Sequence, residues 1–241
     1  MVTFRTLLAW LACATCALAA DLTPAEIIAQ ARAAVAKDPA ALAKVRSLQF
    51  ELTSTNAEGK PAGYTQLEIN VPDQRYQLSL NAARTVEEIL ATNGHEGWRK
   101  STQTTQIGVL RAEFVKVLRD MAASDLTFFA APAERDGAVK AAPTTEIGGR
   151  KQVSLEYAYK SGFRIIRHFD AETFRLTATD QPMPDGKVQR QLVTATTVVD
   201  GIVFTQKETV LVDGQKTAEV TYEKIAVNPT LTPGHFTFPT R

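Results

Sequence analysis

The first hydrophobic pattern of the chain has the spacing of an amphipathic helix. Thr23 precedes Pro24, and Glu26 follows Thr23 by three positions, which is the pattern of a capping box with proline at the first helical position. Apolar residues then recur every three or four positions until Asp38 and the proline after it interrupt them. The pattern therefore predicts a helix over residues 24–37, followed by a second short helical piece.

Past this helical region the spacing of the apolar residues changes to two, which is typical of β-strands with one buried face. Dipeptides that favour tight turns, among them Asp200-Gly201 and Asp213-Gly214, separate the alternating runs. After Val139 the alternation continues almost to the end of the chain. This part of the sequence predicts a meander of sequential antiparallel strands.

One further helix is predicted within the strand region, over residues 105–124. Apolar side chains there fall on one face of a helix, and charged side chains fall on the other. We expect this helix to lie on the sheet, with residues 125–137 as an exposed loop whose apolar side chains need cover. The predicted apolar face consists of Ile107, Leu110, Phe114, Val117, Leu118 and Met121.

Together these elements predict an α+β fold. A long, curved antiparallel β-sheet would carry a few α-helices on one face and wrap a cavity. The chain of 241 residues is 44% hydrophobic, which is ample material for a core, and it shows neither an internal repeat nor a low-complexity segment. We therefore expect residues 21–241 to form a single domain.

The first twenty residues have the pattern of a secretory signal peptide. Arg5 precedes an apolar run from Leu7 to Leu18, and small residues follow this run. The run is too short to span a bilayer, because a transmembrane helix takes about 20 apolar residues. We expect cleavage after Ala19 or Ala20 and export of a soluble protein to the periplasm.

Removal of this signal peptide would change the chemistry of the chain. Both cysteines, Cys13 and Cys16, lie within it, so the mature chain would lack disulfides, thiol catalysis and thiolate metal sites. A lipid anchor on one of them is the alternative, although neither cysteine follows the leucine and small residues that such an anchor requires. Loss of Arg5 takes the formal charge from +1 to 0, which argues against nucleic acid as a partner.

The last part of the chain carries motifs that resemble those of a known family. A strand follows each of the two Asp-Gly turns, then comes Val227-Asn228-Pro229, and residues 236–239 have the form Phe-x-Phe-Pro. With the order of helices and strands, these motifs resemble the LolA/LolB-like family of periplasmic carriers that sort outer-membrane lipoproteins. The resemblance implies an incomplete β-barrel, or half-barrel, with α-helices covering its concave face and apolar ligands held between them.

The same resemblance implies a binding protein rather than an enzyme, without a cofactor or a metal. Its partners would be lipoprotein or lipid acyl chains, together with inner- or outer-membrane proteins that donate or accept them, and the carrier would be a monomer. An alternative on the same fold is an envelope-stress sensor or a protein-interaction module that transfers no lipid.

A cavity for acyl chains needs apolar walls, because each buried CH2 group contributes about 0.8 kcal/mol. The helix over residues 105–124 is the expected lid, although an apolar face would equally serve ordinary core packing. Arg75 is the best match for the gating arginine of the family. The predicted cavity residues are Leu48, Phe50, Leu67, Ile69, Tyr76, Leu78 and Trp98 on the strands, with Leu110, Phe114 and Leu118 on the lid helix.

Two groups of polar residues have the residue types of a metal or catalytic site. His168, Asp170 and Glu172 alternate along the chain, but Asp170 begins a predicted hairpin turn, which would direct these side chains apart. His95 and Glu96 lie between glycines, where a turn is favoured. The sequence lacks the Gly-x-Ser-x-Gly motif of many hydrolases. An exported hydrolase would therefore require His95 or His168 to meet a serine and a carboxylate from distant strands.

The C-terminal segment, residues 227–241, is rich in proline and phenylalanine, although chain ends are usually loosely ordered. We expect it to act as a strap that closes the half-barrel. In this interpretation Phe236 and Phe238 are alternating residues of a short closing strand. His235 is expected at a turn or a strand edge, with its imidazole in solvent.

Overall fold

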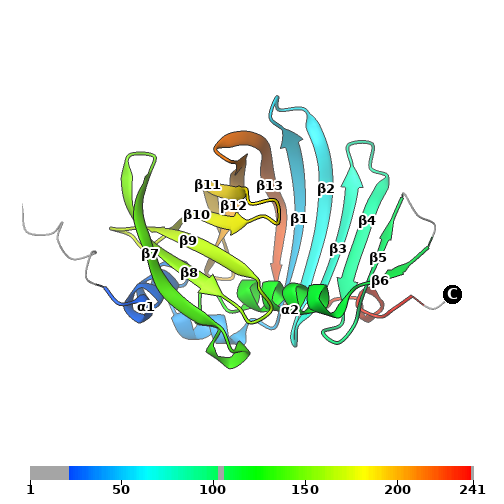
Figure 1. Ribbon diagram of the computed structural model, residues 1–241, viewed down its shortest axis with the longest axis horizontal. Coiled ribbons are helices and arrows are strands. Elements are labelled where there is room, and N and C mark those ends of the chain that lie inside the picture. The colour runs from blue at the N-terminus through cyan, green and yellow to red at the C-terminus, as the bar shows by residue number, and fades with distance from the viewer. Residues whose placement is uncertain (1–21, 103–105, 240–241) are drawn as a thin grey trace, which may run out of the picture.

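The computed structural model describes residues 22–102 and 106–239 (Figure 1). The predicted signal peptide, residues 1–20, lies outside the described residues. Within the described ranges, none of the helices has both the length and the apolar character needed to cross a membrane.

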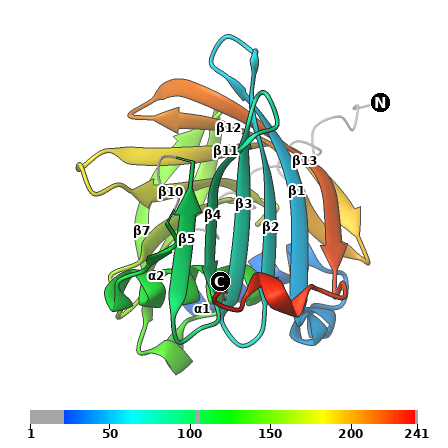
Figure 2. The same ribbon diagram turned by 90° about the vertical axis from the view of Figure 1, so that its right-hand side faces the viewer.

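The described residues form one antiparallel sheet of thirteen strands. Its order is β6-β5-β4-β3-β2-β1-β13-β12-β11-β10-β9-β8-β7, so only the pairing of β1 with β13 joins strands that are distant in sequence. The sheet curves strongly, and its edge strands β6 and β7 stay apart (Figure 1, Figure 2). The strands are β1 (Ser47–Asn56), β2 (Pro61–Asn70), β3 (Gln74–Asn81), β4 (Val86–Thr92), β5 (Gly97–Ser101), β6 (Gly108–Val109), β7 (Ala138–Ile147), β8 (Arg150–Ala158), β9 (Arg164–Asp170), β10 (Leu176–Pro182), β11 (Val188–Val199), β12 (Ile202–Val212) and β13 (Gln215–Val227).

The helices lie on the concave face of this sheet. Helix α1 (Pro24–Val35) begins with the predicted capping box at Thr23 and contacts β12 and β7. Helix α2 (Ala112–Leu126) contacts β2, β3 and β4. Three short 3-10 helices complete the described part of the chain, and they are η2 (Pro39–Lys44), η3 (Ala133–Arg135) and η4 (Pro233–His235). The predicted α+β half-barrel with helices on its concave face is confirmed.

The start of α2 differs from the prediction, because the helix begins at Ala112 and not near residue 105. Before it, Gly108 and Val109 form β6 and pair with β5, which extends the edge of the sheet. The apolar residues ahead of the helix happened to continue its spacing, although they belong to a strand and its connection. The side chains of α2 that are buried are Val115, Leu118, Asp120, Ala122, Ala123, Ser124 and Leu126.

Apolar side chains form two clusters on opposite faces of the sheet. The larger cluster joins α1, the end of α2 and the concave face, and it contains Leu48, Ile69 and Tyr157. The smaller cluster contains Tyr76 and Phe236 and lies on the convex face, where the C-terminal tail crosses β1 to β4 (Figure 2). The tail is therefore a separate cover on the outside of the half-barrel.

The predicted closing strand is wrong. The tail forms η4 and a turn, in which Phe236 is buried and Phe238 is partly buried. A further strand had no free edge to join here, because β1 already pairs with β13 on one side and with β2 on the other. The tail can only lie across the face of the strands.

The prediction that the His235 imidazole lies in solvent is also wrong. The ring stacks on Tyr76 with 4.3 Å between the ring centroids, and its Nδ1 atom lies 2.9 Å from Oε2 of Glu68. Glu68 is only 2% exposed and also accepts hydrogen bonds from the side chains of Gln49 and Gln66. A buried carboxylate needs such partners, and the tail supplies one of them.

Candidate functional site

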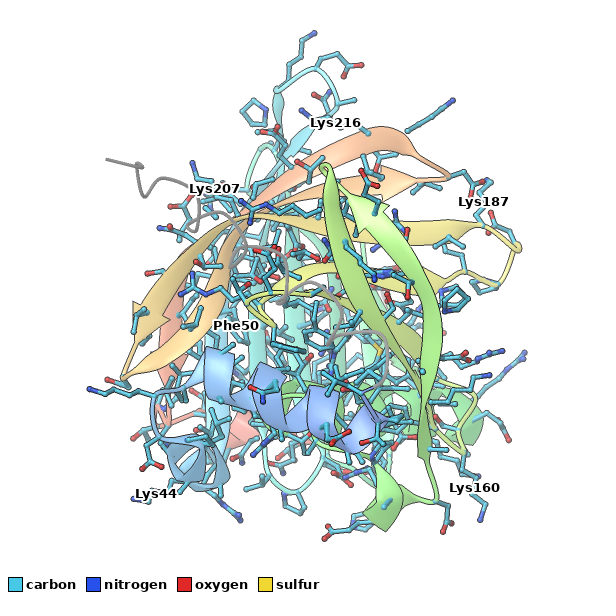
Figure 3. The ribbon with its side chains drawn as sticks, turned by 90° about the vertical axis from the view of Figure 1, so that its left-hand side faces the viewer. Lys44, Phe50, Lys160, Lys187, Lys207 and Lys216 are labelled. Atoms are coloured by element: carbon cyan, nitrogen blue, oxygen red, sulfur yellow. The ribbon has the colours of Figure 1, made fainter. Side chains whose placement is uncertain are left out.

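A cavity of about 250 Å³ lies between the concave face of the sheet, α1 and the loop that follows α2. Figure 3 shows Phe50 in the interior behind α1, whereas the labelled lysines lie at the periphery. Much of the wall is apolar, and its largest apolar side chains are Leu48, Phe50, Leu67, Phe128, Phe129 and Phe204. Such a wall suits an apolar ligand.

Three of the predicted cavity residues, Leu48, Phe50 and Leu67, line this cavity. Ile69 belongs to the same core cluster and is fully buried, one pleat further along β2. Phe50 packs edge to face against Phe204. Residues of β1 and β2 thus bring one part of the predicted wall together.

Three other predicted wall residues, Tyr76, Leu78 and Trp98, lie in the convex cluster. Successive side chains of a strand point to opposite faces, so the face of one residue decides the face of all. In β3 the residues on the concave side are Arg75 and Gln77, which hydrogen-bond each other, and Arg75 also bonds to α2. The alternation along β3 is as predicted, but its apolar residues face the tail.

The predicted lid residues are separated from one another. Leu110 precedes α2, donates its amide to the carbonyl of Gly97 and packs beside that glycine. Leu118 is buried on α2, whereas the side chain of Phe114 is 44% exposed. None of the three lines the cavity within the described part of the chain.

The loop after α2 contributes cavity residues that the sequence pattern did not identify. Phe128 and Phe129 both have left-handed backbone conformations, with φ of 45° and 69°. Bulky residues rarely adopt this conformation, which costs about 1–3 kcal/mol each. Arg32 donates a hydrogen bond to the carbonyl of Phe128, and the Tyr157 hydroxyl donates one to the carbonyl of Phe129. These contacts hold two strained aromatic residues against the cavity.

Most of the loop after α2 is exposed, as the sequence predicts, and its large apolar side chains have the cover that they need. The side chains of Phe128 and Phe129 are only 7% and 9% exposed, and they pack in the main core. Residues of α1 and of the sheet cover these two phenylalanines.

An ion pair joins α2 to the concave face beside the cavity. Arg75 is 8% exposed, and its Nη1 atom lies 3.3 Å from Oδ2 of Asp125, which lines the cavity. The surrounding protein groups partly desolvate Asp125 and raise its pKa, although its side chain is 43% exposed, while Arg75 and Arg167 act against this rise. The Nε atom of Arg75 has no hydrogen-bond partner among the described residues. The predicted gating arginine thus contacts the cavity wall through Asp125.

Glu208 adds a second acidic group to the wall. Its side chain is 7% exposed and its carboxyl group is near the Tyr222 hydroxyl. Burial raises the pKa of Glu208 to about 7, and the hydrogen bond with Tyr222 acts in the opposite direction. Burial, with the nearby Glu208, also raises the pKa of Tyr222.

Two further arginines line the cavity, Arg167 and Arg175. Arg167 is buried, donates a hydrogen bond of 2.7 Å to Oγ of Ser124, and stacks over the rings of Phe129 and Tyr157. Arg175 follows β9, is exposed, and makes no side-chain hydrogen bond or ion pair with the described residues. The wall is therefore apolar with several fixed charges.

On the outer face of the sheet, three strands bring together Ser154, His168 and Asp180. Nδ1 of His168 lies 2.8 Å from Oγ of Ser154, and Nε2 lies 3.1 Å from Oδ2 of Asp180. Arg190 donates two hydrogen bonds of 2.6 Å to the Asp180 carboxylate. Burial opposes ionisation of Asp180, but the bonds from Arg190 and His168 outweigh it and lower its pKa to about 2.

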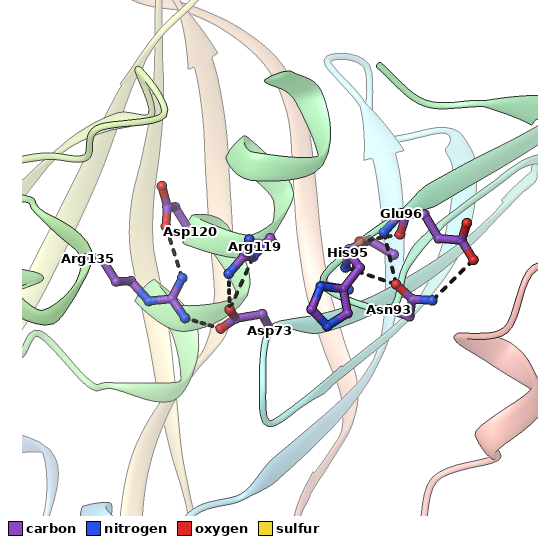
Figure 4. Close-up of polar contacts among 9 residues, drawn as sticks. Asp73, Asn93, His95, Glu96, Arg119, Asp120 and Arg135 are labelled. Atoms are coloured by element: carbon purple, nitrogen blue, oxygen red, sulfur yellow. Dashed lines mark hydrogen bonds and ion pairs between the residues drawn. The ribbon is translucent and has the colours of Figure 1, made fainter. Parts of the chain in front are cut away.

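The remaining polar groups form turns, as the sequence predicts. Asp170 accepts hydrogen bonds from the backbone of Glu172 and from the backbone and hydroxyl of Thr173. The amides of His95 and Glu96 donate to the side chain of Asn93, as Figure 4 shows. Asp170 is thus engaged within its own turn and does not face His168 as a ligand.

No protein-family model matches this chain, and no curated protein matches its sequence. Its fold, however, is similar to that of solved structures. A LolA superfamily protein from Nitrosomonas europaea matches with a TM-score of 0.57 and 11% identity, over 90% of this chain and 98% of the other. A DUF1329 family protein from Desulfovibrio piger matches with a TM-score of 0.54 and 11% identity, over 88% of this chain and 96% of the other.

A putative outer membrane lipoprotein-sorting protein domain from Vibrio parahaemolyticus is similar to the same extent. Its TM-score is 0.53 at 12% identity, and the match covers 88% of this chain and 94% of the other. At these identities the similarity establishes the fold alone. The resemblance to LolA-like proteins is therefore confirmed for the fold.

Proposed function

We propose that this protein is a periplasmic, non-enzymatic carrier that holds lipoprotein acyl chains or other lipids in the cavity of its half-barrel. The observation that carries the proposal is the apolar cavity on the concave face, with aromatic side chains from β1, β12 and the loop after α2. The names of the similar structures, a LolA superfamily protein and a putative lipoprotein-sorting domain, support the same class of function.

The chemistry of the wall is suited to acyl chains. Phe50, Phe128 and Phe204 present rings to the cavity, and Leu67 adds an aliphatic surface. Transfer of an acyl chain from water to such a surface gains about 0.8 kcal/mol for each CH2 group. In this proposal residues 21–241 act as one monomeric domain, and membrane proteins donate and accept the lipid.

The direct test is saturable binding of fluorescent acyl probes by delipidated protein. A carboxylate placed in the cavity should oppose an acyl chain, so Leu67→Glu should weaken binding at least tenfold. Val198→Glu is the matched control, because Val198 is 64% exposed and does not line the cavity. Absence of saturable binding by the unaltered protein would refute the carrier.

A hydrolase is the second candidate, because His168 does meet a serine and a carboxylate from neighbouring strands. The residue types and the two hydrogen bonds match those of a catalytic triad. Against it, the Ser154 and His168 side chains are almost fully buried, at 3% and 5% exposure, and Arg190 already occupies the Asp180 carboxylate. A nucleophile must reach its substrate, so the same contacts serve better to hold β8 to β11 together.

A fluorophosphonate probe distinguishes the two functions, since it labels only activated serines. If the protein is a carrier, the probe should not label the unaltered protein. Labelling that Ser154→Ala abolishes would establish the hydrolase.

A further inference from the structure

The cavity and its immediate surroundings carry more positive than negative charge. Arg167 and Arg175 line the cavity, and Arg75 lies directly behind its wall, bonded to Asp125. The acidic groups at the wall are Asp125 and Glu208. Three cations thus face two acids, and burial keeps Glu208 substantially protonated near neutral pH.

The positive charges at the wall are incompletely neutralised by protein groups. The one acid that hydrogen-bonds an arginine here is Asp125, and it bonds Arg75. Arg167 senses the charge of Asp125, but the oxygens that it hydrogen-bonds, those of Ser124 and the Tyr157 hydroxyl, are neutral. A guanidinium has five N–H donors, so Arg167 retains donors for another acceptor. Desolvated cations of this kind are stabilised by an anion.

Arg175 places a further cation at the mouth of the same cavity. Its side chain is exposed and lines the cavity, without a carboxylate partner among the described residues. Gln191 and Thr179 line the cavity as well and offer additional hydrogen-bond donors. An anionic group at this mouth would meet donors from β10, β11 and the turn after β9.

The size of the cavity limits the apolar part of its ligand. At about 250 Å³ it falls just below the range of about 300–1,000 Å³ that is usual for small-molecule sites. This volume accommodates part of one acyl chain between Phe50, Phe128 and Phe204, whereas the several chains of a fully acylated lipoprotein would need more room.

We propose that the cavity binds a single-chain anionic amphiphile, with its chain among the aromatic residues and its carboxylate or phosphate head at Arg175 and Arg167. The proposal rests on the carrier function above and names its ligand class. A charged head recognised by arginine distinguishes such a ligand from an uncharged lipid of the same chain length.

Competition binding with the delipidated mature chain tests this proposal. The reporter is N-phenyl-1-naphthylamine, an uncharged apolar fluorophore, and the competitors are dodecanoate, dodecyl phosphate and dodecanol. Both anions should displace the reporter at concentrations about tenfold below that of dodecanol, as expected for charge-assisted hydrogen bonds. The stronger of the two anions identifies the head group as carboxylate or phosphate.

Arg175→Gln should remove this preference, with the anions losing about tenfold in apparent affinity and dodecanol unchanged. Arg99→Gln is the matched control, because Arg99 is an exposed arginine on β5 away from the cavity and should leave the preference intact. Equal competition by dodecanoate and dodecanol, with no effect of Arg175→Gln, would overturn the anionic ligand and leave the carrier standing. Failure of the reporter and all competitors to bind would refute the carrier itself.

Discussion

At the scale of single residues, Glu208 is the group whose environment most directly links stability to pH. It lies in the wall of the cavity beside Tyr222 and is 7% exposed. Burial disfavours its charged form, which raises its pKa from 4.5 to about 7 in the folded protein. Ionisation of Glu208 therefore opposes folding.

The direction of the resulting pH dependence follows from this raised pKa. Below about pH 4.5 the carboxyl group is protonated in both the folded and the unfolded state, so it does not lower the free energy of unfolding. Between about pH 4.5 and 7 only the unfolded chain releases the proton, so stability falls, and above pH 7 the loss is complete. A shift of this size corresponds to a loss of about 3 kcal/mol.

Glu208→Gln should therefore raise the free energy of unfolding at pH 8 and leave it nearly unchanged at pH 4.5, since glutamine keeps the shape without the charge. Urea unfolding at the two pH values measures the difference. Glu87→Gln, at an exposed position of β4, is the control and should change neither value. Equal effects of Glu208→Gln at both pH values would contradict the buried, ionising carboxylate.

At the scale of elements, α2 is held at its outer side by a network of ion pairs (Figure 4). Asp73, in the turn between β2 and β3, accepts hydrogen bonds from Arg119 on α2 and from Arg135 on η3. Arg135 also lies 3.1 Å from the Asp120 carboxylate. Asp120 is 8% exposed and belongs to this network, although the sequence places it with the charged side chains opposite the apolar face. The network fixes the helix that the lid hypothesis requires to move.

Asp73→Asn should loosen this attachment, because asparagine keeps the left-handed backbone at φ of 67° but loses the charge that both arginines bind. We expect the free energy of unfolding to fall by about 1–3 kcal/mol. The matched control is Asp136→Asn, at φ of 52° and in an exposed ion pair with Lys160, which should cost less than about 1 kcal/mol. Equal effects of the two substitutions on the free energy of unfolding in urea would show that the ion pairs of Asp73 do not hold α2 in place.

At the scale of the whole molecule, the segment that leads into β1 meets the segment that leaves β13. The Asn228 side chain accepts hydrogen bonds from the amides of Arg46 and Ser47 and donates one to the carbonyl of Lys44. The tail then crosses the convex face and places Phe236, which is 4% exposed, in the cluster with Tyr76. The Val-Asn-Pro motif thus turns the chain from the last strand onto the outer face.

Deletion of residues 236–241 should lower the melting temperature, because it removes a buried phenylalanine and uncovers Tyr76 and Trp98. The single change Phe236→Ala should cost about 3 kcal/mol, measured by thermal and urea unfolding. Thr232→Ala, at an exposed position of the same segment, should have little effect. A melting temperature unchanged by the deletion would refute the strap.

Local patterns sufficed to predict most of the elements, although not the start of α2 or the conformation of the tail. The capping box at Thr23 and the Asp-Gly turns at Asp200 and Asp213 specify backbone conformations through neighbouring residues, and they are present as expected. Alternation along each strand likewise follows from the geometry of an extended chain. These features predicted a curved antiparallel sheet with helices, because each depends on only a few consecutive residues.

Only the tertiary structure decided which face of each strand borders the cavity. Alternation is identical for both faces, so the placement of Tyr76 beneath the tail and of Phe50 in the cavity depends on the curvature of the whole sheet. The pairing of charges at the cavity was not predictable from local patterns either, since Arg75 meets Asp125 across 50 residues of sequence. Sequence alone determined most of the elements, whereas the site was decided by how distant strands and loops meet.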